Sequence, residues 1–368
     1  MSGYTLRMNI FVEALVFVLV SYLSLTNSLA SYIESWLPTE EAATETPNEV
    51  EEGFLNLPTI FGQSIPDILL RSNEYQQAAL GAAAGLSGST TNDPFDALVN
   101  IFCTFKTKDY IRTTTGTGFF IDPDGIIMTN AHIAQFLLLE KTDSFGDADC
   151  IVRSGSPAAP RYRADLLYIP PTWIQENASL IDDAAPMGTG ERDYALLYVT
   201  EDIDSSPLPA TFPALPYNDD LLSTSVREDE VVAAGYPARD LIKNGASTDL
   251  LAKRATTSIS ELYTFGSNYA DVFSVRGSVV GAEGASGGPI VDANGDVIGM
   301  IATRGDDNVD GEGSLRAITL SHINRTINEE TGFSLTDNLA GNLPYRAKIF
   351  ADTMTPFLLE TLEEGKSE

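Results

Sequence analysis

Short apolar runs, separated by turn-forming residues, fill the chain from about Pro94 onward and limit the folds it can adopt. Eight runs are strand candidates: residues 97–105, 116–122, 125–131, 193–199, 230–237, 271–277, 288–293 and 296–303. Pro123-Asp124-Gly125 separates two of them and is a hairpin signal. Few helical stretches lie between these runs, which is typical of antiparallel barrels. The sequence therefore predicts an all-β barrel architecture for this region.

Acidic residues outnumber basic ones, with 52 Asp and Glu against 22 Lys and Arg and a formal net charge of −30. A surface this negative repels nucleic acid and anionic lipid headgroups, so we expect no nucleic-acid partner. The chain has two histidines, His132 and His322. Any chemistry that needs an imidazole therefore has two candidates.

The N-terminus contains an apolar segment, residues 8–25, in which Glu13 is the only charge. Arg7 precedes this segment and the next basic residue is Arg71, an asymmetry that directs the following chain out of the cytoplasm. Residues 1–30 fit both a cleaved signal peptide and a retained membrane anchor, in either case with a hydrophobic helix. We therefore expect an exported protein, in the cell envelope or outside the cell, with membrane attachment through 8–25 as one alternative.

Acidic segments flank the strand-rich region. Residues 31–94 read as an acidic linker that carries a helical extension at 66–84. Residues 331–368 read as a partly helical, acidic tail that is too short for another ordinary domain.

Ser286 lies in the stretch EGASGGPIVDANGDVIGM, beside Gly284, Gly287 and Gly288. A serine hydroxyl becomes an effective nucleophile only with a base to take its proton and donors to bind the developing oxyanion. Glycines let the chain turn sharply and bring main-chain N–H groups to a substrate. An ordinary glycine-rich loop is the alternative interpretation of this stretch.

The base would be His132, just past a strand candidate, or His322, on the first turn of an expected helix, where a surface or packing role is the simpler interpretation. The carboxylate that orients the base would be Asp193, which leads directly into an apolar strand candidate. Asp182 and Asp183, in a predicted loop, are alternatives.

Two layouts compete for Ser286. GASGG satisfies the G-x-S-x-G pattern of an α/β-type esterase, which requires a helix after the serine and then Asp and His in that order. Pro289 and a predicted β-hairpin follow instead. The order His132, Asp193, Ser286 is that of chymotrypsin.

Four blocks of sequence, in this order, resemble trypsin-like serine peptidases, and specifically the HtrA/Deg-like group. They are GTGFFIDPDGIIMTNAHI with His132, RDYALLYV with Asp193, VVAAGYP, and GASGGPIVDANGDVIGMI with Ser286. The resemblance covers roughly residues 95–330. No PDZ domain of the kind common in that group is expected in the remaining chain.

The resemblance implies two antiparallel six-stranded β-barrels and a serine endopeptidase acting on protein or peptide substrates. His132 and Asp193 would come from the first barrel and Ser286 from the second, and the N–H groups of Gly284 and Ser286 would form the oxyanion hole. We expect no cofactor and no metal. A non-catalytic binding module with the same fold is the alternative.

The substrate pocket is expected among the residues before Ser286 and on the last strand candidate. The candidates are Val280, Gly281, Ile301, Ala302 and Thr303. They are small or apolar, so we expect a preference for small or medium aliphatic side chains over Lys or Arg.

Two further expectations concern order and activation. Cys103 and Cys150 either pair across adjacent strands of the first barrel or remain buried thiols. Activated trypsin-like enzymes pair a new N-terminal amine with an aspartate just before the nucleophile, but Ala285 occupies that position here. We therefore expect no N-terminal insertion, and an oxyanion loop that is ordered by other contacts.

Overall fold

The structure, a computed structural model, describes residues 88–107, 111–142, 144–181, 190–244, 249–266 and 268–367. All of them belong to one compact unit. The predicted N-terminal hydrophobic helix and nearly all of the acidic linker lie outside the described residues. Among the residues that are described, no helix combines the length and the apolar character needed to span a membrane.

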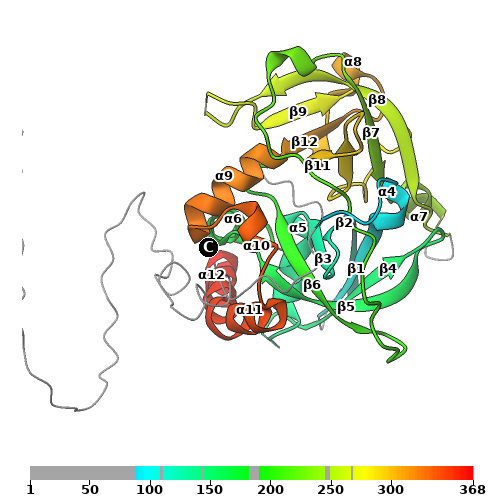
Figure 1. Ribbon diagram of the computed structural model, residues 1–368. Helices are drawn as coiled ribbons and strands as arrows, with labels where there is room; N and C mark the ends of the chain where they lie inside the picture. Colours follow the sequence, from blue (N-terminus) through cyan, green and yellow to red (C-terminus); the bar gives the residue numbers. More distant parts are fainter. Residues whose placement is uncertain are drawn as a thin grey trace, which may run out of the picture. The chain divides into compact units, whose positions relative to one another are not determined.

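Two closed antiparallel barrels of six strands each make up the fold, as the family resemblance implied, and Figure 1 shows the second above the first. The first barrel has the order β1-β2-β3-β6-β5-β4 and the second the order β10-β11-β12-β9-β8-β7. The strands of the first are β1 (Leu98–Lys106), β2 (Ile111–Asp122), β3 (Ile126–Thr129), β4 (Asp147–Ser154), β5 (Ala159–Tyr168) and β6 (Ala195–Asp202). The strands of the second are β7 (Glu230–Gly235), β8 (Lys253–Tyr263), β9 (Val272–Val275), β10 (Pro289–Val291), β11 (Val297–Arg304) and β12 (Leu315–Thr319).

Short helices connect and flank the strands. They are α4 (Pro94–Ala97), α5 (Ala131–Leu139), α6 (Pro171–Asn177), η1 (Ala178–Leu180), η2 (Thr224–Val226), α7 (Arg239–Asn244) and α8 (Asp307–Asp310). After β12 come α9 (Leu320–Thr331), α10 (Leu335–Asn338), α11 (Leu343–Ile349), η3 (Phe350–Met354) and α12 (Thr355–Ser367). The predicted helix after β12 is α9, and the side chain of Thr319 caps it by accepting from the His322 N–H.

All eight strand candidates exist, and four further strands, β4, β5, β8 and β12, were not among them. The sequence of β8, KRATTSISELY, is mostly polar, and most of its side chains are at least partly exposed. It pairs with β7 and β9, so the tertiary ladder and not its own hydrophobicity makes it a strand. β12 has only five residues and follows a turn.

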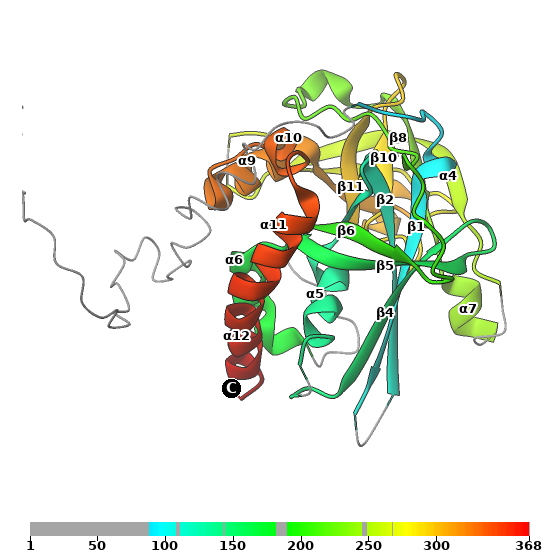
Figure 2. The ribbon, with the colours of Figure 1, turned by 60° about the horizontal axis from the view of Figure 1, so that its bottom comes forward.

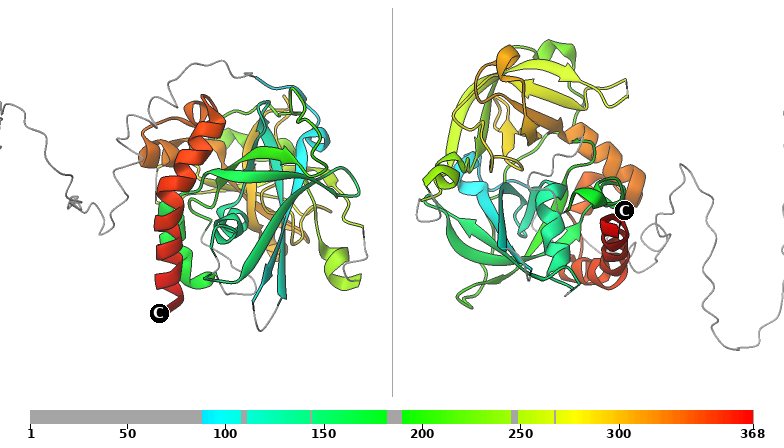
Figure 3. Two further views of the ribbon diagram at one scale, coloured as in Figure 1. Left: turned by 90° about the horizontal axis from the view of Figure 1, so that it is seen from below. Right: turned by 180° about the vertical axis from the view of Figure 1, so that it is seen from behind.

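The segment after residue 330 is part of the packed structure and not a free tail. Figures 2 and 3 show α11, η3 and α12 running as one rod beside the first barrel. Phe350, Met354, Leu358 and Leu362 recur every four residues, are buried, and belong to the same apolar core as the first barrel. The expected boundary at residue 330 falls inside α9 (Leu320–Thr331).

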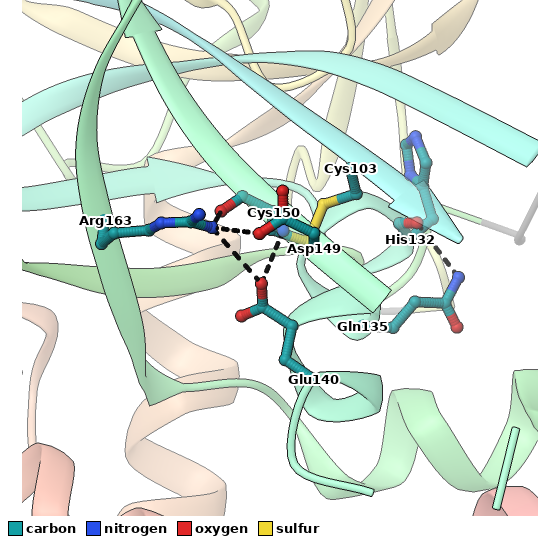
Figure 4. The surroundings of a disulfide bond; sticks show 7 residues. All are labelled: Cys103, His132, Gln135, Glu140, Asp149, Cys150 and Arg163. Carbon is teal, nitrogen blue, oxygen red and sulfur yellow. Dashed lines mark hydrogen bonds and ion pairs between the residues drawn. A yellow bond between two sulfur atoms is a disulfide. The ribbon is translucent and has the colours of Figure 1, made fainter. Parts of the chain in front are cut away.

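Cys103 and Cys150 face each other in the register of β1 and β4 and form a disulfide. Figure 4 shows Glu140 and Arg163 beside it. Glu140, which follows α5, accepts from the Cys150 N–H at 2.5 Å, and Arg163 donates to the Cys150 carbonyl at 2.7 Å. Burial raises the pKa of the Glu140 carboxyl, which the Cys150 N–H and Arg163 oppose.

Replacing both cysteines by serine should lower the free energy of unfolding by roughly 4 kcal/mol, because the bond closes a loop with a sequence separation of 47 residues. Urea unfolding of the oxidised protein and of the double variant measures the difference. Mass spectrometry of non-reduced peptides provides the control. Two alkylatable thiols in the oxidised protein would contradict the disulfide.

Leu358→Ala should destabilise the protein by about 3 kcal/mol, because Leu358 on α12 is fully buried against the first barrel. Glu360→Ala, on the exposed side of the same helix, is the matched control and should change stability little. Thermal or urea unfolding checks both variants. Equal, small effects would mean that α12 contributes no core.

Candidate active site

His132 lies just past the end of β3, as the sequence had suggested, on the first turn of α5, a helix that was not expected there. β3 ends at Thr129, and the carbonyl of Asn130 accepts the first helical N–H bonds, from Ile133 and Ala134. The helix start fixes the backbone at His132. Gln135 also donates to the His132 carbonyl, at 3.0 Å (Figure 4).

Asp193 lies two residues before β6, and its side chain is 2 % exposed. One carboxylate oxygen accepts from the His132 backbone N–H at 2.9 Å, and the other lies 2.7 Å from His132 Nδ1. Asn130 donates to the Asp193 carbonyl at 2.8 Å. A carboxylate at Nδ1 favours the tautomer with the proton there, which leaves Nε2 as the acceptor. The alternatives Asp182 and Asp183 lie outside the described residues.

Ser286 lies in the sharp turn that leads into β10. Gly284 and Gly287 have φ values of +92° and +87°, where side chains are strained. A Cβ at Gly284 would lie 2.6 Å from the Tyr236 carbonyl oxygen, and one at Gly287 would lie 1.9 Å from the Thr117 carbonyl oxygen. The turn therefore requires glycine at both positions.

Thr117, in β2 of the first barrel, holds this turn and is fully buried. Its hydroxyl donates to the Gly284 carbonyl at 2.7 Å and accepts from the Tyr236 N–H at 2.9 Å. Its N–H donates to the Ser286 carbonyl at 2.7 Å, and its carbonyl accepts from the Thr129 hydroxyl at 2.8 Å. Thr117 thus joins the Ser286 turn to the end of β3, three residues before His132. The sequence analysis included Thr117 in the segment around His132 but did not predict these contacts.

The peptide before Gly284 is oriented by a second contact between segments. The Glu283 carbonyl accepts from the Ala238 N–H at 2.7 Å. In a trans peptide the following N–H points the opposite way, so the Gly284 N–H faces away from Ala238. Neither the Gly284 nor the Ser286 N–H has an acceptor among the described residues. Both donors therefore remain without an acceptor within the described part of the turn.

The Ser286 hydroxyl donates to the Ala302 carbonyl at 3.3 Å. Within the described part of the chain no hydrogen bond joins it to His132. Such bonds are often loose in a free enzyme and tighten when substrate binds.

A cavity of about 180 Å³ is lined in part by Ala302, whose carbonyl accepts from the Ser286 hydroxyl. Its walls are Gly190, Tyr263, Phe265, Val272, Ala302, Thr303, Arg316 and Ile318. Of the predicted pocket residues, Ala302 and Thr303 line it. Val280 and Ile301 are instead buried in the core of the second barrel, and Gly281 packs against Gly313, whose carbonyl oxygen a Cβ would meet at 1.8 Å. Two aromatic lining residues, Tyr263 and Phe265, form what we call the aromatic wall of the cavity. The sequence did not predict them as pocket residues, because they lie at the end of β8, which was not a strand candidate, and in the turn after it.

His322 is buried on the first turn of α9, a packing position in agreement with the simpler interpretation of the sequence. Its Nδ1 lies 3.1 Å from a carboxylate oxygen of the fully buried Asp271. Burial lowers the pKa of His322, which Asp271 opposes and Arg325 and Arg192 reinforce. None of its hydrogen bonds reaches Ser286.

No group of three or more His, Cys, Asp or Glu side chains among the described residues could hold a metal ion. The candidate site offers the Ser286 hydroxyl, the His132 imidazole, the Asp193 carboxylate and main-chain donors. This set suits acyl transfer through an activated serine.

The chain matches one protein family. The family model described as a trypsin-like peptidase domain matches residues 116–300, just over half of the chain. No curated protein matches the chain. Among solved structures, the active form of the Rv3671c protease from M. tuberculosis is 20% identical, with a TM-score of 0.40, and the match covers 78% of this chain and 96% of that one. The inactive form is also 20% identical, with a TM-score of 0.38 and coverage of 65% and 91%.

The family match spans the segment that carries His132, Asp193 and Ser286, together with Thr117. The two barrels around it are closed and antiparallel. On these grounds, this chain belongs to the trypsin-like peptidase family.

Proposed function

We propose that this protein is a serine endopeptidase that cleaves proteins or peptides through an acyl-enzyme intermediate. One observation carries the proposal more than any other. The buried Asp193 carboxylate binds both the backbone N–H and Nδ1 of His132, so that the imidazole is fixed with Nε2 as its free base. Membership of a peptidase family points to peptide bonds as the target.

In the proposed reaction, Nε2 of His132 takes the proton of the Ser286 hydroxyl as the oxygen attacks the scissile carbonyl. The hydroxyl must first leave the Ala302 carbonyl, to which it donates at 3.3 Å. The imidazolium then gives this proton to the leaving amine, while Asp193 stabilises the positive charge. Water, deprotonated by the same imidazole, hydrolyses the acyl-enzyme and restores the serine.

The developing oxyanion would be bound by the N–H groups of Gly284 and Ser286. Both lack an acceptor among the described residues, and the Glu283 carbonyl is turned toward Ala238. Donors that are already oriented need no reorganisation during the reaction, which is where such sites gain most. The contacts of Thr117 and Ala238 with the loop before Ser286 support the expectation that this loop is ordered without an inserted N-terminus.

Export and the substrate preference remain predictions. The segment that would direct export, residues 1–30, lies outside the described residues. The preference for aliphatic over basic side chains next to the scissile bond rests on the sequence alone, because Val280, one of the residues on which it was based, is buried in the core of the second barrel.

The triad assignment predicts that a fluorophosphonate probe labels the wild-type chain but not Ser286→Ala. His132→Ala should lower kcat/KM for peptide hydrolysis on the order of 10⁴-fold or more, because the serine loses its base. Labelling followed by mass spectrometry identifies the modified residue. An unlabelled wild-type protein would favour the non-catalytic binding module.

His322→Ala separates this proposal from the esterase alternative. An esterase layout requires His322 as the base, so its loss would abolish labelling while His132→Ala would leave it intact. The present assignment predicts the reverse order of effects. Unfolding midpoints of the two variants provide the control for folding.

Activity should not require a new N-terminus. Ala285 is fully buried in the apolar core of the second barrel and offers no carboxylate to an inserted amine. The full-length chain, with its intact mass verified, should therefore be labelled at the same rate before and after limited proteolysis removes residues 1–87. Labelling that begins only after the cut would refute this prediction.

A further inference from the structure

The aromatic wall of the cavity comes from a turn that is held in place by one buried carboxylate. Tyr263 ends β8 and Phe265 follows it, and both line the cavity. The Asp271 carboxylate accepts from the Phe265 N–H at 2.8 Å and from the Thr264 hydroxyl at 3.0 Å. Its backbone N–H also donates to the Tyr263 carbonyl at 2.9 Å. Asp271 therefore fixes the backbone from Tyr263 to Phe265.

Helix α9 in turn fixes Asp271. His322 Nδ1 lies 3.1 Å from its other carboxylate oxygen, which also accepts from Arg325. At the N-cap of the helix, the Thr319 N–H donates to the Asp271 carbonyl at 2.9 Å. The His322 ring also packs against the Phe265 ring, with centroids 5.2 Å apart. His322 thus contacts the wall both through Asp271 and directly.

The cavity lies where a bound polypeptide would pass. Ala302, whose carbonyl accepts from the Ser286 hydroxyl, forms part of its lining together with Thr303. Gly190, three residues before Asp193, also lines the cavity. Tyr263, Phe265, Val272 and Ile318 make the lining largely apolar.

We propose that Asp271 and His322 are positioning residues that hold Phe265 in place, so that the cavity binds a large apolar or aromatic substrate side chain away from the scissile bond. This inference rests on the proposed peptidase function. The buried imidazole takes no part in the chemistry, since its Nε2 atom is buried and has no partner among the described residues. Within the described part of the chain, the His322 side chain makes one polar contact, the bond to Asp271, which a neutral histidine donates through Nδ1–H.

The test uses fluorogenic peptides that carry Phe or Gly at the second, third or fourth position before the scissile bond. For the full-length wild-type chain, kcat/KM should favour Phe over Gly by roughly tenfold at one of these positions, through KM. His322→Phe keeps a ring but removes the donor to Asp271, so it should lose this preference while kcat stays close to that of the wild type. His322→Asn, whose amide nitrogen lies about where Nδ1 lies, should retain most of it.

Two further variants keep the test decisive if His322→Phe fails to fold. Phe265→Ala removes the wall itself from a partly exposed turn and should also abolish the preference. Tyr345→Ala, an exposed aromatic residue on α11, is the matched control and should retain it.

Three outcomes would overturn the inference. They are a wild-type protein with no preference at any position, a preference that survives in Phe265→Ala, and an equal loss in kcat for Phe and Gly peptides in His322→Phe. Fluorophosphonate labelling of each variant separates these outcomes from failure of the peptidase function. A chain that is not labelled at Ser286 fails as a serine peptidase, whereas a labelled chain without the preference fails only here.

Discussion

The hydrogen bonds of Thr117 are the interaction on which the rest of the site depends. One buried residue of the first barrel fixes the Gly284 and Ser286 carbonyls and the Tyr236 N–H, all in the second barrel. A buried hydroxyl that both donates and accepts leaves no unpaired polar group, so its removal would cost more than the bonds alone suggest. The Ser286 turn can approach so closely only because Gly287 has no Cβ.

The other half of the site is fixed by burial. Asp193 is almost inaccessible, and its charge is stabilised by the two N–H groups of His132. The residue before it, Arg192, has φ of +55°, a strained conformation for a side chain of this size. Arg192 forms an ion pair with Glu330 of α9 at 3.2 Å, and Tyr168 donates to the same carboxylate at 2.5 Å. Helix α9 thereby holds Arg192, the residue before Asp193, in position.

Helix α9 therefore serves two ends of the site. Its C-terminal half contacts Arg192, which is next to Asp193, and its first turn contacts Asp271 at the cavity wall. The helices that follow it cover the first barrel and share its core. In this strongly acidic chain, Arg192 pairs with the buried carboxylate of Glu330 and Arg325 pairs with that of Asp271. Without these arginines, both carboxylates would lack a cationic side chain at these positions.

The sequence alone determined the barrel architecture, the order of the three candidate triad residues and the need for glycine around Ser286. These features depend on local alternation, turn residues and spacing along the chain. It did not reveal β8, the helical position of His132, the role of Thr117 or the aromatic wall. Only the tertiary structure decided them, because each arises from contacts between segments far apart in the chain. Thr117 and Gly284, for example, are separated by 167 positions and meet only when both barrels have closed.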